Sequence, residues 1–369
     1  HRSGFVNIIG NPNVGKSTLM NALVGERLSI ITSKAQTTRH RILGIVNGDD
    51  FQIVYSDTPG ILKPSYKLQE SMMRFVQGAL KDADVILYVT DVVEGTDRRS
   101  EIFDRIARSG IRTILVINKI DLTTPERLEE LVAQWRGILP DAEIVPVSAL
   151  NDFNIGGLFD RILAALPEGE PFYPKDALTD KTLRFFASEI IREKIFLNYE
   201  KEIPYSVEIA IEEYKEEPSI DRISATIYVA RESQKGIVIG HRGERLKRVG
   251  TQAREELEQF LGKKVFLQLF VKVNDNWRND DRQLRRFGYI DSRYGALRGE
   301  RGRALAAGAA CGGGVGPLYR SAGSLAVTVS VFRTVRRDPE FPVIIMPLCS
   351  RSGRSDRSGP LMEKNPVVR

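Results

Sequence analysis

Apolar runs of strand length alternate with amphipathic stretches of helix length over the first 166 residues of the chain. The apolar runs predict buried strands at 5–9, 51–56, 111–117 and 143–147. Helices are predicted at 17–24, ended by Gly25, and at 156–166, and Asn47-Gly48 predicts a tight hairpin turn. Strands and helices in turn are typical of an α/β fold with a mixed, mostly parallel sheet and helices on both faces.

The pattern changes after residues 167–174, a segment with three prolines and no periodicity. Beyond it we predict a helix at 178–199, with Asp180 as a candidate cap, and alternating strands at 205–214 and 223–230. A short helix at 234–239, a longer helix ending at residue 261 and a strand at 264–273 follow. We therefore divide the chain into a first domain, 1–168, a linker, 169–178, and an α+β domain, 179–290.

Residues 291–369 differ from the rest of the chain in charge and composition. They hold 13 of the 54 Lys and Arg residues but only 6 of the 48 Asp and Glu residues, so the first 290 residues carry a net charge of −1. The overall charge of +6 is therefore no argument for nucleic-acid binding. We expect this Arg/Gly-rich tail, apart from strand-like stretches at 324–332 and 341–348, to be disordered or non-native. The alternative is a genuine RNA-binding extension.

Several classes of protein are disfavoured by what the sequence contains. Its two cysteines, Cys311 and Cys349, lie outside every motif, so neither a disulfide framework nor a zinc site is expected. No apolar run approaches the length that spans a bilayer, and the apolar stretch at 5–9 has no cleavage pattern of a signal peptide. A cytoplasmic protein is expected.

The first predicted strand leads into Gly10-Asn11-Pro12-Asn13-Val14-Gly15-Lys16-Ser17, which fits the phosphate-loop pattern G-x-x-x-x-G-K-[ST]. Glycines let successive backbone N–H groups turn toward a phosphate, and the following helix adds its positive N-terminal end. Lys16 is expected to reach the β- and γ-phosphates, and the Ser17 hydroxyl to bind Mg²⁺. The motif predicts a nucleoside triphosphate site but does not choose the base.

Asn118-Lys119-Ile120-Asp121 indicates that the base is guanine. The motif follows the strand at 111–117, and ligands of open α/β sheets bind at the carboxyl ends of strands. One carboxylate, Asp121, can accept both N1–H and the 2-amino group of guanine, whereas adenine lacks that pair of donors. We expect Asn118 at the other edge of the base and Lys119 over the ring. After the next strand, Ser148-Ala149 would place a backbone N–H near the guanine oxygen.

Two more motifs are expected around the γ-phosphate. In Asp57-Thr58-Pro59-Gly60 the aspartate can hold Mg²⁺ through a water, and the Gly60 N–H can bond the γ-phosphate. A threonine in the polar loop at 36–40 can complete the Mg²⁺ shell only while the γ-phosphate is present, which makes the loop a switch. Thr38 is the first choice for that Mg²⁺ ligand, and the neighbouring Thr37 is the alternative that has to be excluded from this role.

The predicted nucleotide site joins all these motifs. Its metal ligands are Ser17, Thr38 and, through water, Asp57. The predicted nucleotide-binding residues are Gly10, Asn11, Pro12, Asn13, Val14, Gly15, Lys16, Ser17, Thr18, Asp57, Thr58, Pro59, Gly60, Ile61, Asn118, Lys119, Ile120, Asp121, Ser148 and Ala149.

The second domain has the element order of a bacterial-type (type II) KH domain. Gly240-His241-Arg242-Gly243 lies between its last two helices, and a G-x-x-G turn at that place clamps the backbone of about four single-stranded nucleotides. The cations that follow favour phosphate binding, although a solvated helix face is the simpler alternative. His241 is expected near the RNA backbone rather than as a catalytic base. The predicted RNA-binding residues are Gly240, His241, Arg242, Gly243, Arg245, Lys247 and Arg248.

Trp277 follows the last predicted strand, and arginines lie around it and in the segment 282–287. An aromatic ring among arginines suits stacking on a base. It suits packing against the sheet equally well, and the sequence leaves both open.

Residues 4–291 resemble the Era family, bacterial small GTPases related to translation factors that carry a C-terminal KH domain. The resemblance rests on the segments GNPNVGKSTLMNAL, KAQTTRHRI, DTPG, NKID, ASEIIREKI, VIGHRGERLKRVG and VKVNDNW. It implies GTP-dependent binding near the 3′ end of 16S rRNA in 30S subunit assembly. It also implies a monomer, with peripheral association with the inner face of the cell membrane.

Ile61 follows Gly60 where Ras-like proteins have a glutamine that orients the attacking water. Hydrolysis must therefore use another group, an ion or a partner. The resemblance implies that Asn13 contacts a K⁺ ion that acts in place of an arginine finger; the alternative is that Asn13 only shapes the loop. The predicted catalytic residues are thus Lys16, Thr38, Gly60 and Asn13.

We expect a GTP hydrolase whose GTP state binds immature rRNA and whose hydrolysis releases it. The alternative is a non-catalytic RNA chaperone in which GTP gates RNA affinity. A tandem-domain ribosome GTPase is disfavoured because only one set of nucleotide motifs is present.

Overall fold

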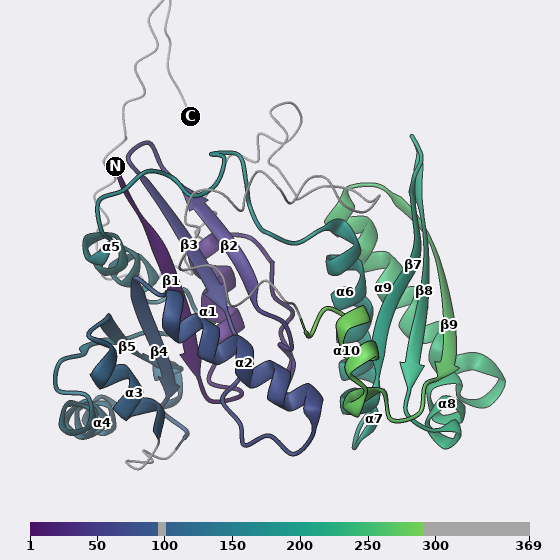
Figure 1. Cartoon of the computed structure of the whole chain (residues 1–369), viewed down its shortest axis with the longest axis horizontal. Coiled ribbons are helices and arrows are strands. Elements are labelled where there is room, and N and C mark those ends of the chain that lie inside the picture. Colours follow the sequence, from purple (N-terminus) through teal and green to yellow (C-terminus); the bar gives the residue numbers. More distant parts are fainter. Residues whose placement is uncertain (95–100, 291–369) are drawn as a thin grey trace, which may run out of the picture. The chain divides into compact units, whose positions relative to one another are not determined.

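The computed structural model describes residues 1–94 and 101–290 of the 369-residue chain (Figure 1). By compactness the chain divides into His1–Ser321 and Ala322–Arg369, so every described residue lies in the first unit. The predicted tail, 291–369, and both cysteines lie outside the described residues. The predicted domain boundaries at 168 and 178 stay predictions.

A six-stranded sheet forms the centre of the N-terminal part, in the order β2-β3-β1-β4-β5-β6. The strand β2 runs antiparallel to β3, and all other neighbours are parallel. The strands are β1 (Arg2–Gly10), β2 (Ile42–Asn47), β3 (Phe51–Asp57), β4 (Val85–Asp91), β5 (Arg112–Asn118) and β6 (Glu143–Pro146). This is the predicted mixed, mostly parallel sheet.

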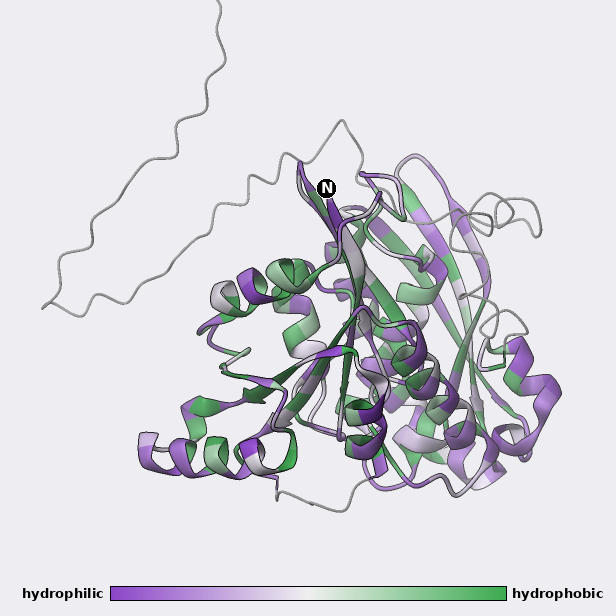
Figure 2. Ribbon diagram, turned by 60° about the vertical axis from the view of Figure 1, so that its left-hand side comes forward, coloured by the Kyte–Doolittle hydropathy of each residue, from purple (hydrophilic) through white to green (hydrophobic). Residues whose placement is uncertain are grey.

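Helices cover both faces of this sheet, because its central strands are apolar on both sides. One apolar cluster joins the sheet to α1 (Lys16–Val24) and α5 (Ile155–Ala165). A second cluster joins its other face to α2 (Lys67–Asp82), α3 (Glu101–Ser109) and α4 (Pro125–Ile138). Figure 2 shows hydrophobic residues along the strands and hydrophilic residues on outward helix surfaces. The parallel strands end at one edge, and this edge brings the predicted motifs together.

The C-terminal part is built on a three-stranded sheet in the order β7-β8-β9, with β7 and β8 antiparallel and β8 and β9 parallel. Its elements are α6 (Leu183–Asn198), α7 (Ile203–Ser206), β7 (Glu208–Glu216), β8 (Ile220–Val229), α8 (Glu232–Ile239), α9 (Glu244–Leu261) and β9 (Lys264–Val273). One apolar cluster joins α6, α8 and α9 to a single face of the sheet. This is the α+β KH arrangement that the element order predicted.

Two local predictions were wrong. Residues 203–206, partly assigned to a strand, form α7, because Pro204 in its first turn fixes a helical φ where no N–H is needed. The helix predicted from residue 178 begins at Leu183, and its cap is Thr182, whose hydroxyl accepts from the Phe185 N–H. Asp180 instead accepts from the Leu43 N–H at 3.0 Å. The predicted hairpin at Asn47-Gly48 is present: β2 and β3 pair antiparallel and are joined by residues 48–50.

Trp277 packs in the core and is 0% exposed. It begins the short 3₁₀ turn η3 (Trp277–Asn279), which precedes α10 (Asp281–Arg286). Its indole N–H donates to the Ser206 carbonyl at 3.0 Å, and its ring belongs to an apolar cluster with residues of α2. Of the two open roles, packing is therefore correct, and base stacking is excluded by burial.

No helix within residues 1–94 and 101–290 is both long enough and apolar enough to cross a bilayer.

Candidate functional site

The loop between β1 and α1 is shaped by close backbone approaches that only glycine allows. Gly15 has a φ of 93°, and a Cβ there would lie 2.2 Å from the Asn118 side-chain nitrogen. A Cβ on Gly10 would lie 2.1 Å from the Val89 carbonyl oxygen. The two glycines of the phosphate-loop pattern therefore let the loop fold tightly against β4 and the residues after β5. The N-terminus of α1 opens directly from this loop.

Lys16 is buried beneath the loop, and its Nζ donates to the Asn11 carbonyl at 2.6 Å. Burial lowers the pKa of the Lys16 amine to about 8, while the charges of Asp57 and Glu94 oppose that shift. A buried cation of this kind is stabilised by further negative charge, which a phosphate supplies.

Three oxygen-bearing side chains converge next to Lys16. The Ser17 hydroxyl donates to Asp57 Oδ2 at 2.7 Å, and Thr38 Oγ1 lies 2.9 Å from Ser17 Oγ. Thr38 also donates to Asp57 Oδ2, at 3.4 Å. Asp57 Oδ1 is buried with no hydrogen-bond partner among the described residues, and burial raises the pKa of this carboxyl. Two hydroxyls and a carboxylate with an unsatisfied oxygen form a donor set that fits Mg²⁺.

The neighbouring threonine has a different environment. Thr37 Oγ1 lies 2.5 Å from Thr32 Oγ1 and donates to the Lys34 carbonyl at 2.7 Å. Its hydroxyl is thus used inside its own loop, whereas the Thr38 hydroxyl faces Ser17 and Asp57. The geometry favours Thr38 over Thr37 as the metal ligand.

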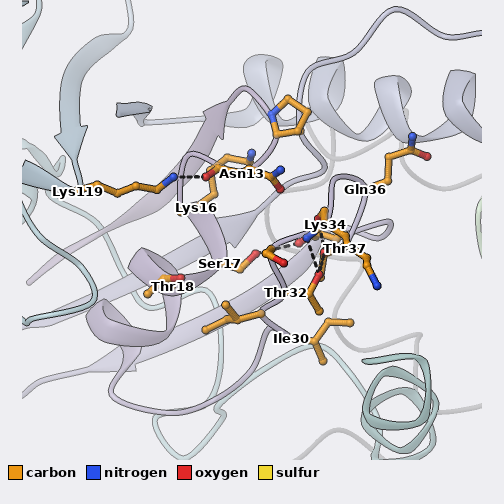
Figure 3. A pocket seen from close by; sticks show the side chains of 16 residues that line it. Asn13, Lys16, Ser17, Thr18, Ile30, Thr32, Lys34, Gln36, Thr37 and Lys119 are labelled. Atoms are coloured by element: carbon orange, nitrogen blue, oxygen red, sulfur yellow. Dashed lines mark hydrogen bonds between the residues drawn. The ribbon is translucent and has the colours of Figure 1, made fainter. Parts of the chain in front are cut away.

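The predicted base-recognition motif ties three loops together after β5. Asn118 Nδ2 donates to the Val14 carbonyl at 2.9 Å, and its Oδ1 accepts from the Ala149 N–H at 3.0 Å. Lys119 Nζ donates to the Asn13 carbonyl at 2.6 Å (Figure 3). Asp121, which is exposed, accepts from the Ser148 hydroxyl. The residues expected around guanine are therefore held next to the phosphate loop.

The segment after β3 comes close to the phosphate loop from the other side. Thr58 donates to the Ile8 carbonyl at 2.7 Å. A Cβ on Gly60 would lie 2.8 Å from the Pro12 Cα, so only glycine fits at that approach. The Ile61 N–H donates to the Gly10 carbonyl at 3.1 Å, and its side chain packs against the apolar cluster under α2. Ile61 therefore offers no group that could orient a water.

A cavity of about 350 Å³ lies over these residues (Figure 3), within the roughly 300–1,000 Å³ of typical ligand sites. Part of its lining was predicted: Pro12, Asn13, Gly15, Lys16, Ser17, Thr18, Thr38, Gly60 and Lys119. Asn118, Asp121, Ser148 and Ala149 are not part of its lining. The predicted switch loop adds Gln36 and Thr37, and the segment before it supplies wall residues that the nucleotide motifs did not identify: Ile30, Ile31, Thr32, Ser33 and Lys34.

Two acidic residues that support the site were also missed. Glu94 accepts from Asn11 Nδ2 at 3.1 Å and from the Thr90 hydroxyl at 2.7 Å, and burial raises its pKa. Asp91, at the end of β4, pairs with Lys119 at 2.5 Å. Neither belongs to a motif, and only the position of Asp91 at a strand end could have indicated it.

The G-x-x-G turn joins α8 to α9 in backbone conformations that favour glycine. Gly240 and Gly243 have φ values of 74° and 79°. A Cβ on Gly240 would lie 2.7 Å from the Arg245 side chain, whereas the space beside Gly243 is open. His241 and Arg242 are exposed between them.

The predicted RNA-binding cations lie free beside this turn. Arg242, Arg245, Lys247 and Arg248 are exposed, and none forms an ion pair with a residue in the described part of the chain. A groove runs on from Gly243 along α9 to Leu267 and Leu269 of β9. The groove is lined by apolar side chains together with Lys247, which is unpaired, and Arg254, which pairs with Glu258 at 3.0 Å. The RNA-binding residues and the solvated-face alternative both stay predictions.

The loop that carries Thr38 also contacts the C-terminal elements. Arg39 is buried, and its guanidinium donates to the Val207 carbonyl at 2.7 Å and the Pro204 carbonyl at 3.0 Å. It also pairs with Glu208 at 3.2 Å. Residues 38 and 39 thus link the proposed metal site directly to the start of β7.

Comparison with protein families matches residues 5–119 to a 50S ribosome-binding GTPase domain and residues 202–278 to a KH domain. Among curated proteins, the GTPase Era of Syntrophus aciditrophicus is 46% identical over 291 residues, which cover 78% of this chain and 95% of the relative. The GTPase Era of Staphylococcus haemolyticus is 44% identical over 293 residues, 79% of this chain and 98% of the relative.

Two solved structures are similar over nearly their full length. A single-residue variant of Aquifex aeolicus Era bound to GDP·AlF₄⁻ matches with a TM-score of 0.76 and 43% identity, covering 79% of this chain and 100% of that one. Era in complex with MgGDPNP and nucleotides 1506–1542 of 16S rRNA matches with a TM-score of 0.76 and 44% identity, covering 79% and 99%.

Proposed function

Because the chain belongs to the Era family of GTPases, we propose that it binds the 3′ end of 16S rRNA through its KH groove and acts in 30S subunit assembly. The chain is a GTP hydrolase with a guanine nucleotide as its ligand, and the non-catalytic chaperone is not retained. GTP binding and hydrolysis are proposed to set its RNA affinity. We place this action in the cytoplasm, by a monomer, with peripheral membrane association kept as a prediction.

In this proposal the phosphate loop and Lys16 hold the triphosphate. Backbone N–H groups at the start of α1 face the phosphates, and Lys16 stabilises the charge that develops on the transferring group. Ser17, Thr38 and Asp57 would hold Mg²⁺, which neutralises phosphate charge when it is bound. The Gly60 N–H would bond the γ-phosphate.

Base selection is assigned to the loops after β5 and β6. The Asp121 carboxylate accepts both donors on the guanine edge, and its hydrogen bond from Ser148 fixes its orientation. Asn118 positions this edge by binding Val14 and Ala149 at the same time.

The contact of Arg39 with the C-terminal elements is the single observation that carries the proposed coupling. Thr38 changes its partners when the γ-phosphate leaves, and the adjacent Arg39 is anchored by three hydrogen bonds to residues 204, 207 and 208. A movement of residue 38 would therefore displace the residues at the start of the KH sheet as well. Breaking the hydrogen bonds of the buried Arg39 guanidinium instead would cost free energy.

Hydrolysis without a switch glutamine is proposed to use K⁺ at Asn13. Asn13 lines the nucleotide cavity (Figure 3) and adopts a left-handed φ of 66°, a conformation that asparagine tolerates better than most residues. Turnover should be faster in potassium than in sodium buffer, and Asn13→Ala should remove the difference. Equal rates in the two buffers would contradict the role, leaving Asn13 as a loop-shaping residue.

Binding to single-stranded RNA tests the proposed target. The full chain, with a non-hydrolysable GTP analogue, is titrated at fixed salt with an RNA copying the 3′ end of 16S rRNA and with a scrambled RNA of equal composition. Tighter binding of the former, lost in Gly240→Asp and Gly243→Asp, is expected because a charged side chain would meet the phosphates. Equal binding of both RNAs would contradict sequence-selective recognition.

A further inference from the structure

The strand β9 has one face of unusual composition. Lys264, Phe266, Gln268, Phe270 and Lys272 alternate along it, and all five side chains are exposed. The two phenylalanine residues are 43% and 49% exposed. The residues between them face α9, where Val265 is buried in the core.

This face lies on the other side of a strand that already walls the RNA groove. Leu267 and Leu269 of β9 line the groove that starts at Gly243. The strand is at the edge of the sheet, with β8 as its only strand neighbour among the described residues. A chain leaving the groove can therefore pass around the edge of β9 and reach Phe266 and Phe270 without crossing another described strand.

The chemistry of the face fits nucleic acid. No acidic residue occurs on β9, and Lys272 forms no ion pair within the described residues. The guanidinium of Arg222, on the neighbouring strand, lies 5.3 Å from the Phe266 ring centre; Arg222 also pairs with Glu217 at 3.0 Å, and Lys264 pairs with Glu258 at 3.3 Å. Exposed rings flanked by cations on an open sheet are the arrangement on which single-stranded bases stack.

The spacing supports two separate stacking positions. Phe266 and Phe270 are four residues apart on the same face, which places them about 13 Å apart along the strand. Gln268 lies between them and carries both a donor and an acceptor for a base edge. A protein-binding strand face would gain most from contiguous aliphatic residues, whereas here each ring is separated from the next by a polar side chain.

We propose that the outer face of β9 is a second RNA-binding surface, on which Phe266 and Phe270 stack bases of the single strand that continues beyond the G-x-x-G groove. The inference rests on the proposed RNA-binding function and extends its site. The groove would hold about four nucleotides, and the β9 face the nucleotides next to them.

Two RNAs of different length separate this surface from the groove. The full chain is titrated with a short RNA that fills only the groove and with a longer one that extends past it. Phe266→Ala/Phe270→Ala should weaken binding of the longer RNA by about tenfold or more for each ring, in line with one base–aromatic stack, and leave the short RNA unaffected. Phe153→Ala, which removes another exposed ring at 59% exposure, is the matched control and should change neither.

A second variant pair keeps the test valid if the alanine variants are destabilised. Phe270→Trp should retain affinity and show indole fluorescence quenched by the longer RNA but not by the short one, whereas Phe270→Leu should lose affinity although its apolar surface is retained. Unchanged affinity in the alanine variants, or loss of self-association instead of RNA binding, would overturn the proposal. If the Gly243→Asp variant also binds both RNAs with the affinity of the wild type, RNA binding by the groove is contradicted. Unchanged affinity in the phenylalanine variants alone contradicts only the β9 surface.

Discussion

Lys16 makes nucleotide binding depend on pH. Its buried amine has a pKa lowered to about 8, and bound phosphates favour the charged form, so binding raises this pKa again. Above pH 8 the free protein must take up a proton to bind GTP. The affinity for GTP should therefore be constant below pH 8 and fall as pH rises above it, by roughly tenfold per unit. Calorimetric titrations from about pH 7 to 9 measure this.

The matched control for this titration is Lys16→Ala, which should bind weakly at every pH and hydrolyse no GTP. Any pH dependence that remains in the variant belongs to other groups. An affinity in the wild type that is the same at both ends of the range would contradict the role of the buried amine.

Thr38 and Thr37 offer a matched pair at adjacent positions. Thr38→Ala should bind GDP normally but lose about tenfold or more of its Mg²⁺-dependent preference for GTP, since one metal ligand is removed. Thr37→Ala should retain that preference, because its hydroxyl bonds only Thr32 and Lys34. Nucleotide-exchange assays with and without Mg²⁺ measure both. A larger effect at Thr37 would reverse the assignment.

For single residues, the phosphate and base motifs could be identified from the sequence because each needs particular residue types at fixed spacing. It favoured Thr38 as the metal ligand but did not exclude Thr37, since both are threonines in one polar loop. Glu94 and Arg39 were not identified, because a buried acid or arginine acquires its role from elements distant in the chain.

Among the elements, strand β9 was predicted with its observed bounds, while α7 was missed. Residues 264–273 are rich in β-branched and aromatic residues, with an apolar residue at every odd position, which favours a strand. In α7 the alternation at residues 205–207 continued into β7 and concealed one helical turn that begins at Ile203. A contact with a distant part of the chain stabilises this helical turn, since the Arg39 guanidinium donates a hydrogen bond to the Pro204 carbonyl.

The link between the switch loop and α7–β7 predicts that Arg39 transmits the nucleotide state. Arg39→Ala should keep its GTP affinity and abolish the nucleotide dependence of RNA binding. It should also destabilise the fold by about 3–5 kcal/mol, because Glu208 is left buried without its cation, with the Tyr289 hydroxyl as its remaining donor. Arg27→Ala, which removes the half-exposed pairs with Glu193 and Glu256, is the control and should retain the coupling.

A double variant separates stability from coupling. Arg39→Ala/Glu208→Gln removes the unpaired charge and should recover part of the lost stability, measured by denaturant unfolding, without restoring nucleotide-dependent RNA binding. Recovery of both properties would mean that Arg39 is only a structural residue.

For the whole molecule, the RNA-binding charge is assigned to the groove and not to the positively charged tail. Removal of residues 291–369 should leave the affinity for the 3′-end RNA unchanged at fixed salt, because the unpaired cations at the groove belong to α9 and the turn before it. Weaker binding with a smaller salt dependence would instead assign phosphate contacts to the tail.

In the proposed coupling, the nucleotide state sets RNA affinity through the contacts of Arg39 with residues 204, 207 and 208. It is tested most directly by measuring the affinity for the 3′-end RNA with a non-hydrolysable GTP analogue, with GDP and without nucleotide, at one salt concentration. We expect tight binding with the GTP analogue and weak binding with GDP or without nucleotide, and loss of the tight binding when Gly240 and Gly243 carry bulky side chains. Equal affinity in all three nucleotide states would contradict it and leave a GTPase and an RNA-binding domain that act independently.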